Sequence, residues 1–277
     1  RFLPATKASP KEMLPIVDKP LIQYAVQEAV EAGITHMVFI TGRNKRAIED
    51  HFDKAYELEM ELEERGRQNL LDQVRDILPK RVSCTYVRQS EALGLGHAVL
   101  CSRAVIGDEP FAVILADDLI DAEVPVLKQM CEVFAQEQRA IIAVQPIPIE
   151  DSASYGIIKG EPVKDRLHRM TGIVEKPHPD VAPSNLAVVG RYILTPALMD
   201  ILERVIPGAG GEIQLTDGIA SLIKAEGAFG YEFEGQRYDC GSKLGYLQAN
   251  VMYALKHAEV SQDFGVFLAG LCGTLQR

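Results

Sequence analysis

The chain has 277 residues, enough for one large α/β domain or two small ones, and its 47% hydrophobic and 25% charged residues are ordinary for a globular protein. The net charge of −10 disfavours a nucleic-acid partner, and no apolar run approaches the roughly 20 residues of a membrane span. The five cysteines are odd in number and none has a Cys-x-x-Cys spacing, which argues against a disulfide framework or a structural zinc site and favours the reducing cytoplasm.

Apolar periodicity predicts strands and helices in alternation through the first half of the chain. We expect helices over residues 20–32, 45–52, 96–103 and 123–136, and strands over residues 37–41, 82–87, 111–115 and 140–144. Strands separated by helices of this length indicate an α/β fold, with a mostly parallel sheet and helices on both faces.

Two regions depart from this alternation. Residues 53–76, within a segment we bound at 53–80, are rich in Glu, Arg and Leu and predict one or two half-exposed helices in a projecting insertion. The segment 150–195 predicts an antiparallel extension of the sheet, from strand-like runs at 155–158, 172–175 and 187–193. Helices beginning at Pro196, Glu212 and Ser242 complete the expected order. Without repeats or a low-complexity linker, we expect a single domain over 1–277 with a C-terminal helical segment over 242–277.

Two acidic residues, Asp117 and Asp118, directly follow the strand expected over 111–115. Ligands of open α/β sheets bind beyond the carboxyl ends of the strands, where an acidic pair can hold a hard divalent cation. Asp is also common in turns after strands, so spacing alone leaves both a cation site and a turn cap open. Asp239, just before Cys240 and Gly241, is by itself typical of a turn. It becomes a candidate functional residue only as a second metal-binding carboxylate.

Basic residues outnumber acidic ones in the first nineteen positions, which makes this segment a candidate phosphate site. Lys11 lies between Pro10 and Pro15, in a chain of restricted shape that lowers the entropy lost when its ammonium group binds a phosphate. A solvated surface lysine is the more common case, and this pattern by itself favours it.

Gly94 and Gly96 open a helix after a strand, where free backbone amides suit an anion or a base carbonyl. Gln89, just upstream, offers the donor and the acceptor that reading a pyrimidine edge requires. An ordinary strand-to-helix turn is the alternative, and we expect His97 to pack or cap rather than to catalyse.

Glu175 and Lys176 are adjacent at the end of an expected strand, so on a regular strand their side chains would point to opposite faces. The glutamate could then accept sugar hydroxyls while the lysine meets a phosphate. A charge pair on an edge strand, worth little energetically, is the alternative.

The order of these motifs carries more information than any one of them. The chain holds, in sequence, Arg-Phe-Leu-Pro, Pro-Lys-Glu-Met-Leu-Pro, a Gln before Gly-Leu-Gly-His-Ala, Leu-Ala-Asp-Asp, Val-Glu-Lys-Pro, Asn-Leu-Ala-Val-Val-Gly-Arg-Tyr, Glu-Ile-Gln-Leu-Thr-Asp and Asp-Cys-Gly-Ser-Lys-Leu-Gly-Tyr. This set resembles the bacterial UTP–glucose-1-phosphate uridylyltransferases from Arg1 to about His257, and His51-Phe52-Asp53 is typical of that branch.

The resemblance implies a Rossmann-like nucleotidyltransferase fold that uses Mg²⁺ and converts UTP and glucose 1-phosphate to UDP-glucose and pyrophosphate. It implies, by position, Arg1 and Lys11 for the triphosphate, Gln89 and Gly94 for uracil, Asp117 and Asp239 for the metal, Gly156, Glu175 and Asn185 for the sugar, and Lys176 for the sugar phosphate. It also suggests a homodimer or homotetramer, in the cytoplasm and without nucleic-acid or membrane partners. The family places a strand and a glycine-rich turn just before the position of Arg1, and we expect such a segment to precede this sequence.

Two alternatives stay open. A relative that uses dTTP or another sugar 1-phosphate differs by small groups, and one methyl is worth only about 1–3 kcal/mol of discrimination. A non-catalytic sugar-nucleotide-binding or regulatory protein could keep the same fold. The presence of Lys11, Asp117 and Lys176 argues against the second alternative.

Overall fold

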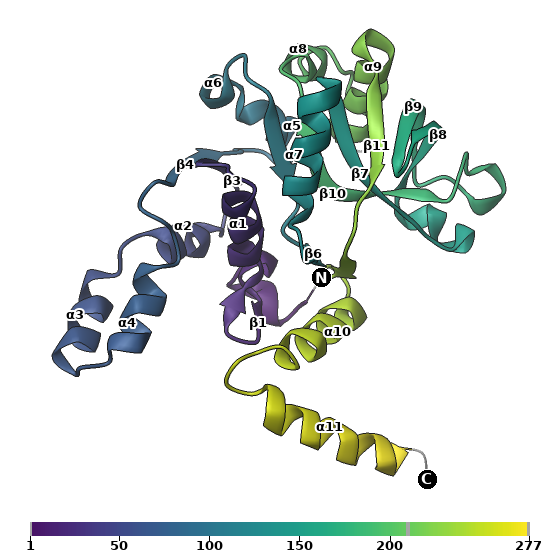
Figure 1. Ribbon diagram of the computed structural model, residues 1–277. Helices are drawn as coiled ribbons and strands as arrows, with labels where there is room; N and C mark the ends of the chain where they lie inside the picture. Colours follow the sequence, from purple (N-terminus) through teal and green to yellow (C-terminus); the bar gives the residue numbers. More distant parts are fainter. Residues whose placement is uncertain (1, 209–210, 276–277) are drawn as a thin grey trace.

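A six-stranded mixed sheet forms the centre of this computed structural model, which describes residues 2–208 and 211–275 (Figure 1). Its strands lie in the order β5 (Phe111–Ile114), β10 (Leu186–Leu194), β7 (Ala140–Pro146), β11 (Ala228–Glu232), β9 (Leu167–Glu175) and β8 (Gly156–Lys164). The predicted strands over 111–115, 140–144, 155–158, 172–175 and 187–193 are therefore confirmed, several of them longer than expected.

The strand directions confirm a mixed sheet, but the strands pair in a different order from a simple parallel arrangement. β7 and β11 are parallel neighbours, whereas β10 lies antiparallel between β5 and β7. β5 and β7 consequently run in the same direction, as the parallel prediction requires, although neither pairs directly with the other. The predicted antiparallel extension is confirmed as the hairpin of β8 and β9.

Helices cover both faces of the sheet, as predicted. One face packs against α1 (Leu21–Glu31) and α7 (Val126–Glu137), and the other against α5 (Leu95–Cys101), α8 (Ala197–Leu202) and α9 (Leu215–Glu226). Successive residues of β7 alternate between the two hydrophobic clusters: Ile141 and Ala143 belong to the first, Ile142 and Val144 to the second. A strand buried on both faces therefore reads as a continuous apolar run.

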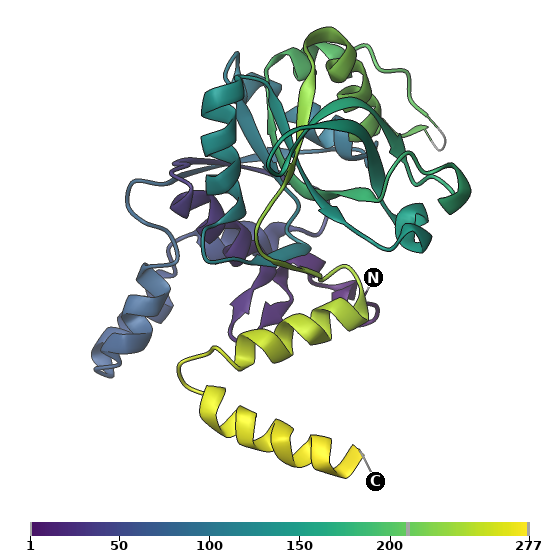
Figure 2. The same ribbon diagram turned by 45° about the vertical axis from the view of Figure 1, so that its right-hand side comes forward.

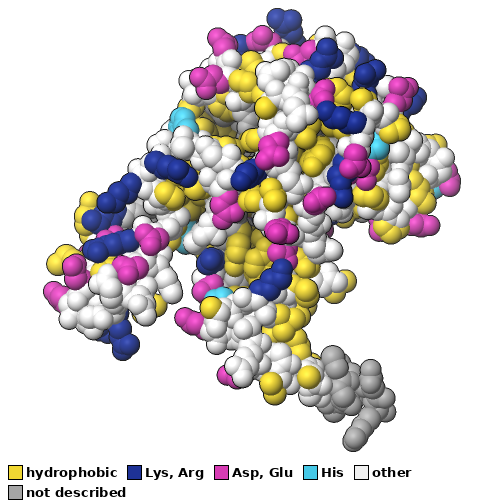
Figure 3. Space-filling model, in the orientation of Figure 1, with side chains coloured by type: hydrophobic (Ala, Val, Ile, Leu, Met, Phe, Trp, Pro, Cys, Tyr) yellow, Lys and Arg dark blue, Asp and Glu magenta, His cyan; other side chains and the backbone are white. Residues whose placement is uncertain are grey.

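A separate parallel pair of strands, β3 (His36–Thr41) and β4 (Ser83–Arg88), lies beside this sheet. Between them the chain forms α2 (Arg46–Phe52), α3 (Tyr56–Glu64) and α4 (Gln68–Arg75). The helical stretch predicted over 53–76 is thus two helices, which project from the body in Figure 1. Acidic and basic side chains are interspersed on this projection (Figure 3), and a buried Glu59 bonds Arg75 between the two helices at 2.9 Å.

The remaining elements are short or C-terminal. They are the hairpin of β1 (Pro15–Ile16) and β2 (Lys19–Pro20), the antiparallel pair β6 (Asp118–Asp121) and β12 (Gln236–Asp239), α6 (Arg103–Ile106), α10 (Lys243–Ala254), α11 (Ser261–Leu275) and the 3-10 turns at Ala5–Lys7, Lys11–Met13, Ile149–Ser154 and Pro179–Val181. α10 and α11 extend from the foot of the body (Figure 2). Within the described ranges, no helix combines the length and the apolar character needed to cross a membrane.

Candidate active site

Two carboxylates that lie far apart in the sequence come together where β5 ends. Asp117 occupies the turn between β5 and β6, and Asp239 ends β12, which pairs antiparallel with β6. A methyl group added at Gly241 would lie 3.2 Å from Asp117 Oδ2 and 3.0 Å from Asp239 Oδ1. The two side chains therefore meet beside the Gly241 backbone, as a shared cation site requires.

The backbone around this carboxylate pair is held by short hydrogen bonds. The Gly241 amide donates to Asp239 Oδ1 at 2.9 Å, and the Cys240 amide donates to the Asp117 carbonyl at 2.8 Å. The first turn of α10 packs directly on this loop, because a methyl group at Gly245 would lie only 2.1 Å from the Asp239 carbonyl oxygen. Only glycine fits at that position.

Lys11, from the turn Lys11–Met13, donates a hydrogen bond to Asp117 Oδ2. Burial is the largest single influence on the Lys11 pKa and acts to lower it, but Asp117, Glu12 and Asp118 together raise this pKa above its ordinary value. Lys11 is thus a cation in contact with Asp117, one member of the carboxylate pair. Lys45, which the sequence did not single out, holds the neighbouring Glu12 at 2.8 Å.

Both carboxylate oxygens of Asp118 are bonded by other groups of the protein. Its Oδ2 accepts the Gly190 amide at 2.8 Å, and its Oδ1 accepts Arg237 Nε at 2.5 Å. The expectation that the adjacent acidic pair could hold a cation is therefore wrong for Asp118. Asp118 is the first residue of β6 and its buried side chain lies beside Gly190, whereas that of Asp117 lies beside Gly241.

The predicted base-reading residues form a second group, after β4. Gln89 Nε2 donates to the Gly94 carbonyl at 3.1 Å and lies 2.9 Å from His97 Nδ1, so its amide is oriented from both sides. Gly94 has φ of +94°, and a methyl group there would lie 2.7 Å from the Ile213 carbonyl oxygen. His97, which we expect to pack or cap, contacts the Gln89 side chain through its Nδ1.

The predicted sugar residues form a third group, at the end of β9. Gly156 pairs with Glu175, and a methyl group at Gly156 would lie 3.4 Å from Glu175 Oε2. That oxygen accepts Thr216 Oγ1 at 2.7 Å. The prediction that Glu175 and Lys176 point to opposite faces is wrong: Lys176 has left the strand, with φ of +47°, and its Nζ lies 3.6 Å from Glu175 Oε1.

Two predicted site residues contribute less. Asn185 lies just before β10 with an exposed side chain, and its carbonyl accepts the Ile147 amide at 2.9 Å. Arg1 lies outside the described residues, so its expected role stays a prediction.

Residues that the sequence analysis missed join the three groups. Arg237, which holds Asp118, donates to Tyr155 Oη at 3.3 Å, and the Tyr155 carbonyl accepts the Lys176 amide at 2.9 Å. The Ile213 amide donates to the Leu93 carbonyl, and the Ile213 carbonyl accepts the Gly96 amide. Three residues later in the chain, Thr216 donates to Glu175. The available signal was proximity in sequence, since Arg237 precedes Asp239 and Thr216 lies in the Glu-Ile-Gln-Leu-Thr-Asp run.

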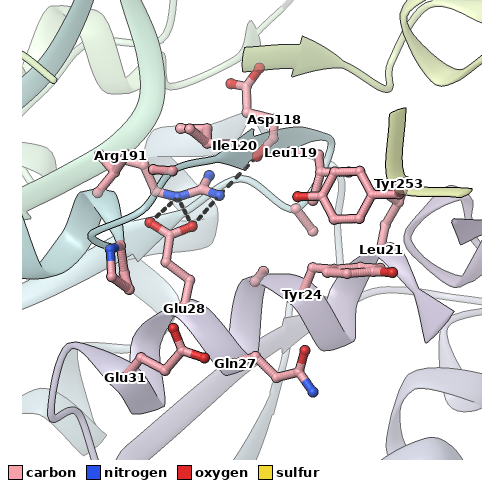
Figure 4. Close-up of a pocket in the computed structure, with 15 residues that line it drawn as sticks. Leu21, Tyr24, Gln27, Glu28, Glu31, Asp118, Leu119, Ile120, Arg191 and Tyr253 are labelled. Atoms are coloured by element: carbon pink, nitrogen blue, oxygen red, sulfur yellow. Dashed lines mark hydrogen bonds and ion pairs between the residues drawn. The ribbon is translucent and has the colours of Figure 1, made fainter. Parts of the chain in front are cut away.

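A cavity of about 120 Å³ lies beside Asp118 (Figure 4). Its walls come from α1, β6, the start of α7 and Tyr253, and the buried pair of Glu28 and Arg191 crosses it. None of the described residues of the three groups lines it, and the nearest in sequence that do are Ala116 and Asp118, on either side of Asp117. We therefore assign the ligand site to the three groups above and not to this cavity.

The donor set fits a hard cation that keeps most of its ligands from water or substrate. Within residues 2–208 and 211–275, no group of three or more His, Cys, Asp or Glu side chains is gathered as a metal site. Mg²⁺ commonly uses only one or two protein carboxylates and takes phosphate oxygens for the remainder. Asp117 and Asp239 are two carboxylates that could fill this role.

Comparisons with known proteins bear on the family of the chain. The profile of the family described as "Nucleotidyl transferase" matches residues 1–256. The UTP–glucose-1-phosphate uridylyltransferase of Bacillus subtilis is 50% identical over 98% of this chain and 92% of its own length. A crystal structure of UDP-glucose pyrophosphorylase complexed with UDP-glucose is 48% identical, with a TM-score of 0.85 over 93% of this chain and 95% of that one.

A UTP-bound UGPase from Acinetobacter baumannii is 43% identical and has a TM-score of 0.91 over 97% of this chain and 94% of its own. These similarities extend over nearly the whole chain and include every described group of the site. The chain therefore belongs to the nucleotidyl transferase family, in the branch of the bacterial UTP–glucose-1-phosphate uridylyltransferases.

Proposed function

We propose that this protein transfers the uridylyl group of UTP to glucose 1-phosphate and forms UDP-glucose and pyrophosphate. The observation that carries the proposal is the meeting of Asp117 and Asp239 beside Lys11, at the carboxyl end of β5. With a divalent cation on the two carboxylates, such a site would neutralise phosphate charge, which is the main requirement of phosphoryl-type transfer. The names of its half-identical relatives supply the substrate pair.

At the nucleotide end, Gln89 and Gly94 are proposed to read uracil. The donor of Gln89 already bonds Gly94 and His97, which leaves its carbonyl oxygen to accept the N–H of the base. Arg1 and Lys11 are proposed to bind the triphosphate. Asp117 and Asp239 would hold Mg²⁺, which supplies neutralisation of the phosphate oxygens when bound.

At the sugar end, Gly156, Glu175 and Asn185 are proposed to contact glucose, and Lys176 its phosphate. Glu175 is fixed by Thr216, so its remaining acceptor capacity is preorganised for a hydroxyl. The unusual left-handed backbone of Lys176 is held by the bond of its amide to the Tyr155 carbonyl. A strained, well-held residue of this kind is typical of a functional position.

The chemistry needs no protein nucleophile. An oxygen of the sugar phosphate forms a new bond to the α-phosphorus of UTP, while the bond from that phosphorus to the pyrophosphate oxygen breaks. The attacking phosphate is already ionised at neutral pH, so positioning and charge neutralisation account for the catalysis. Lys176 orients the attacking oxygen, and Lys11 and Arg1 stabilise the charge of the departing pyrophosphate.

The test is pyrophosphate release across a panel of UTP, dTTP and ATP with glucose 1-phosphate and other sugar 1-phosphates. We expect UTP with glucose 1-phosphate to be the best pair, by roughly 10-fold or more over dTTP. Faster turnover with dTTP would instead identify a thymidylyltransferase. Tight UDP-glucose binding without any turnover would identify a non-catalytic binding protein.

Gly245→Ala is expected to displace Asp239 and weaken the dependence of turnover on Mg²⁺. The added methyl group has no space beside the Asp239 carbonyl, 2.1 Å away, and overpacking of this kind costs about 1–3 kcal/mol. The measurements are the melting temperature and the Mg²⁺ concentration for half-maximal turnover.

Gly265→Ala in α11 is the matched control, since its nearest neighbour there would be 3.9 Å away. The control should keep or slightly increase stability, because alanine lowers the entropy of the unfolded chain. Equal behaviour of the two variants would show that α10 does not constrain Asp239.

A further inference from the structure

The most completely buried charge in the described part of the chain is Arg191 of β10, whose side chain is only 2% exposed. Its Nε lies 3.0 Å from both oxygens of Glu28, and its Nη2 lies 2.8 Å from Glu28 Oε2 (Figure 4). A buried ion pair is weak evidence for stability, because desolvating two charges offsets most of their attraction. The pair therefore calls for an explanation beyond stability.

The other hydrogen bonds of Arg191 supply one. Nη1 donates to the Leu115 carbonyl at 3.0 Å, and Nη2 donates to the Asp118 carbonyl at 2.8 Å. Leu115 and Asp118 are the residues on either side of the two-residue turn that carries Asp117. One rigid guanidinium thus bonds both ends of the turn that presents the proposed metal ligand.

The same turn is fixed from its other sides. The Leu115 amide donates to the Gly190 carbonyl at 2.8 Å, and the Asp118 side chain accepts the Gly190 amide at 2.8 Å. A methyl group at Gly190 would lie 2.5 Å from Leu115 Cβ, so the residue before Arg191 can only be glycine. β10 therefore holds the turn both through the Gly190 backbone and through the Arg191 guanidinium.

We propose that Arg191, oriented by Glu28, is a positioning residue that fixes Asp117 at the correct separation from Asp239 for binding a divalent cation; this rests on the proposed function. Glu28 is itself anchored, because its Oε1 also accepts the Leu127 amide at 3.1 Å, at the start of α7. The connection runs from α1 through a buried guanidinium to the carboxylate pair. Neither Arg191 nor Glu28 contacts substrate in this assignment.

Arg191→Lys is the informative variant. Lysine keeps the charge, but its single ammonium cannot span the two carbonyls and Glu28 as the planar guanidinium fork does. We expect Mn²⁺ binding, measured by electron paramagnetic resonance with saturating UDP-glucose, to weaken by about 10-fold or more, the usual effect of losing a partner that orients a metal ligand. We also expect kcat to fall, with KM for glucose 1-phosphate within about twofold of wild type.

Glu28→Gln is the second variant, and Glu59→Gln is its control. Glu59 is likewise buried and bonded by an arginine, Arg75, but it lies in the projecting helices α3 and α4. Glu28→Gln should weaken Mn²⁺ binding. Glu59→Gln should lower the melting temperature but leave Mn²⁺ binding unchanged. If Arg191→Lys does not fold, this pair decides.

Unchanged Mn²⁺ affinity in folded Arg191→Lys or Glu28→Gln would overturn the positioning role, as would an equal loss in Glu59→Gln. Failure of the proposed function is a different result. In that case wild-type protein would bind Mn²⁺ but release no pyrophosphate from UTP and glucose 1-phosphate. Asp117→Asn would still lose Mn²⁺ binding, and Arg191→Lys would still bind Mn²⁺ more weakly than wild type.

Discussion

Asp117→Asn is expected to remove Mg²⁺-dependent turnover while the protein stays folded. The change keeps the shape of the side chain but deletes the charge that faces Lys11 and lies beside Asp239. Removal of one preorganised electrostatic contact typically lowers kcat by roughly 10²–10³-fold. The Asp117 side chain is 29% exposed and outside the hydrophobic clusters, so the core is not disturbed.

The measurement is a Mg²⁺ titration of pyrophosphate release, with a thermal melt to verify folding. Asp121→Asn is a close control, because Asp121 also pairs with a lysine, Lys256, and is similarly exposed at 25%. Asp121→Asn should retain wild-type turnover. An Asp117→Asn protein with an unaltered Mg²⁺ titration would remove Asp117 from the metal site.

Lys176→Ala should lower kcat by roughly 10²-fold, since the ammonium is the proposed partner of the attacking phosphate. Its side chain is 60% exposed and its contact with Glu175 is long, at 3.6 Å, so little folding energy depends on it. Steady-state kinetics with varied glucose 1-phosphate would separate kcat from KM. Lys164→Ala is the control. Lys164 in β8 forms a similarly exposed ion pair with Glu137 of α7, and its substitution should leave kcat and KM unchanged.

A Lys176→Ala enzyme within a few-fold of wild type would contradict the assigned role. A rise in KM alone would mean that Lys176 binds the sugar phosphate equally in the ground state and the transition state. Neither result would affect the assignment of Asp117 and Asp239 to the metal site.

The long, strongly patterned elements were predictable from the sequence, and the short or non-local features were not. The apolar spacing in 20–32 predicted α1 within one residue at each end, whereas β6 and β12 are only four residues each, too short for periodicity to detect. β11 contains Gly230 and an alternation too brief to predict a strand. The insertion of β10 between β5 and β7 depends on pairing across the chain, about which local periodicity says nothing.

The site shows the same division. The resemblance implied a shared site for Asp117 and Asp239, and the structure places both carboxylates beside Gly241. Spacing alone did not distinguish Asp117 from Asp118, because Gly190 and Arg237, the partners of the Asp118 carboxylate, are distant in the sequence. Arg191 and Glu28 are 163 positions apart and each looks like an ordinary charged residue until the fold buries them together.

The stretch from Ile213 to Thr216 borders two groups at once, since Ile213 bonds Gly96 and Thr216 bonds Glu175. A substitution that enlarges the loop around Gly94 would push on Ile213 and, three positions later in the chain, on Thr216, the partner of Glu175. In the proposed assignment, the preferences for the base and for the sugar are therefore coupled through this stretch. A change of nucleotide, in evolution or engineering, would then favour paired substitutions over single ones.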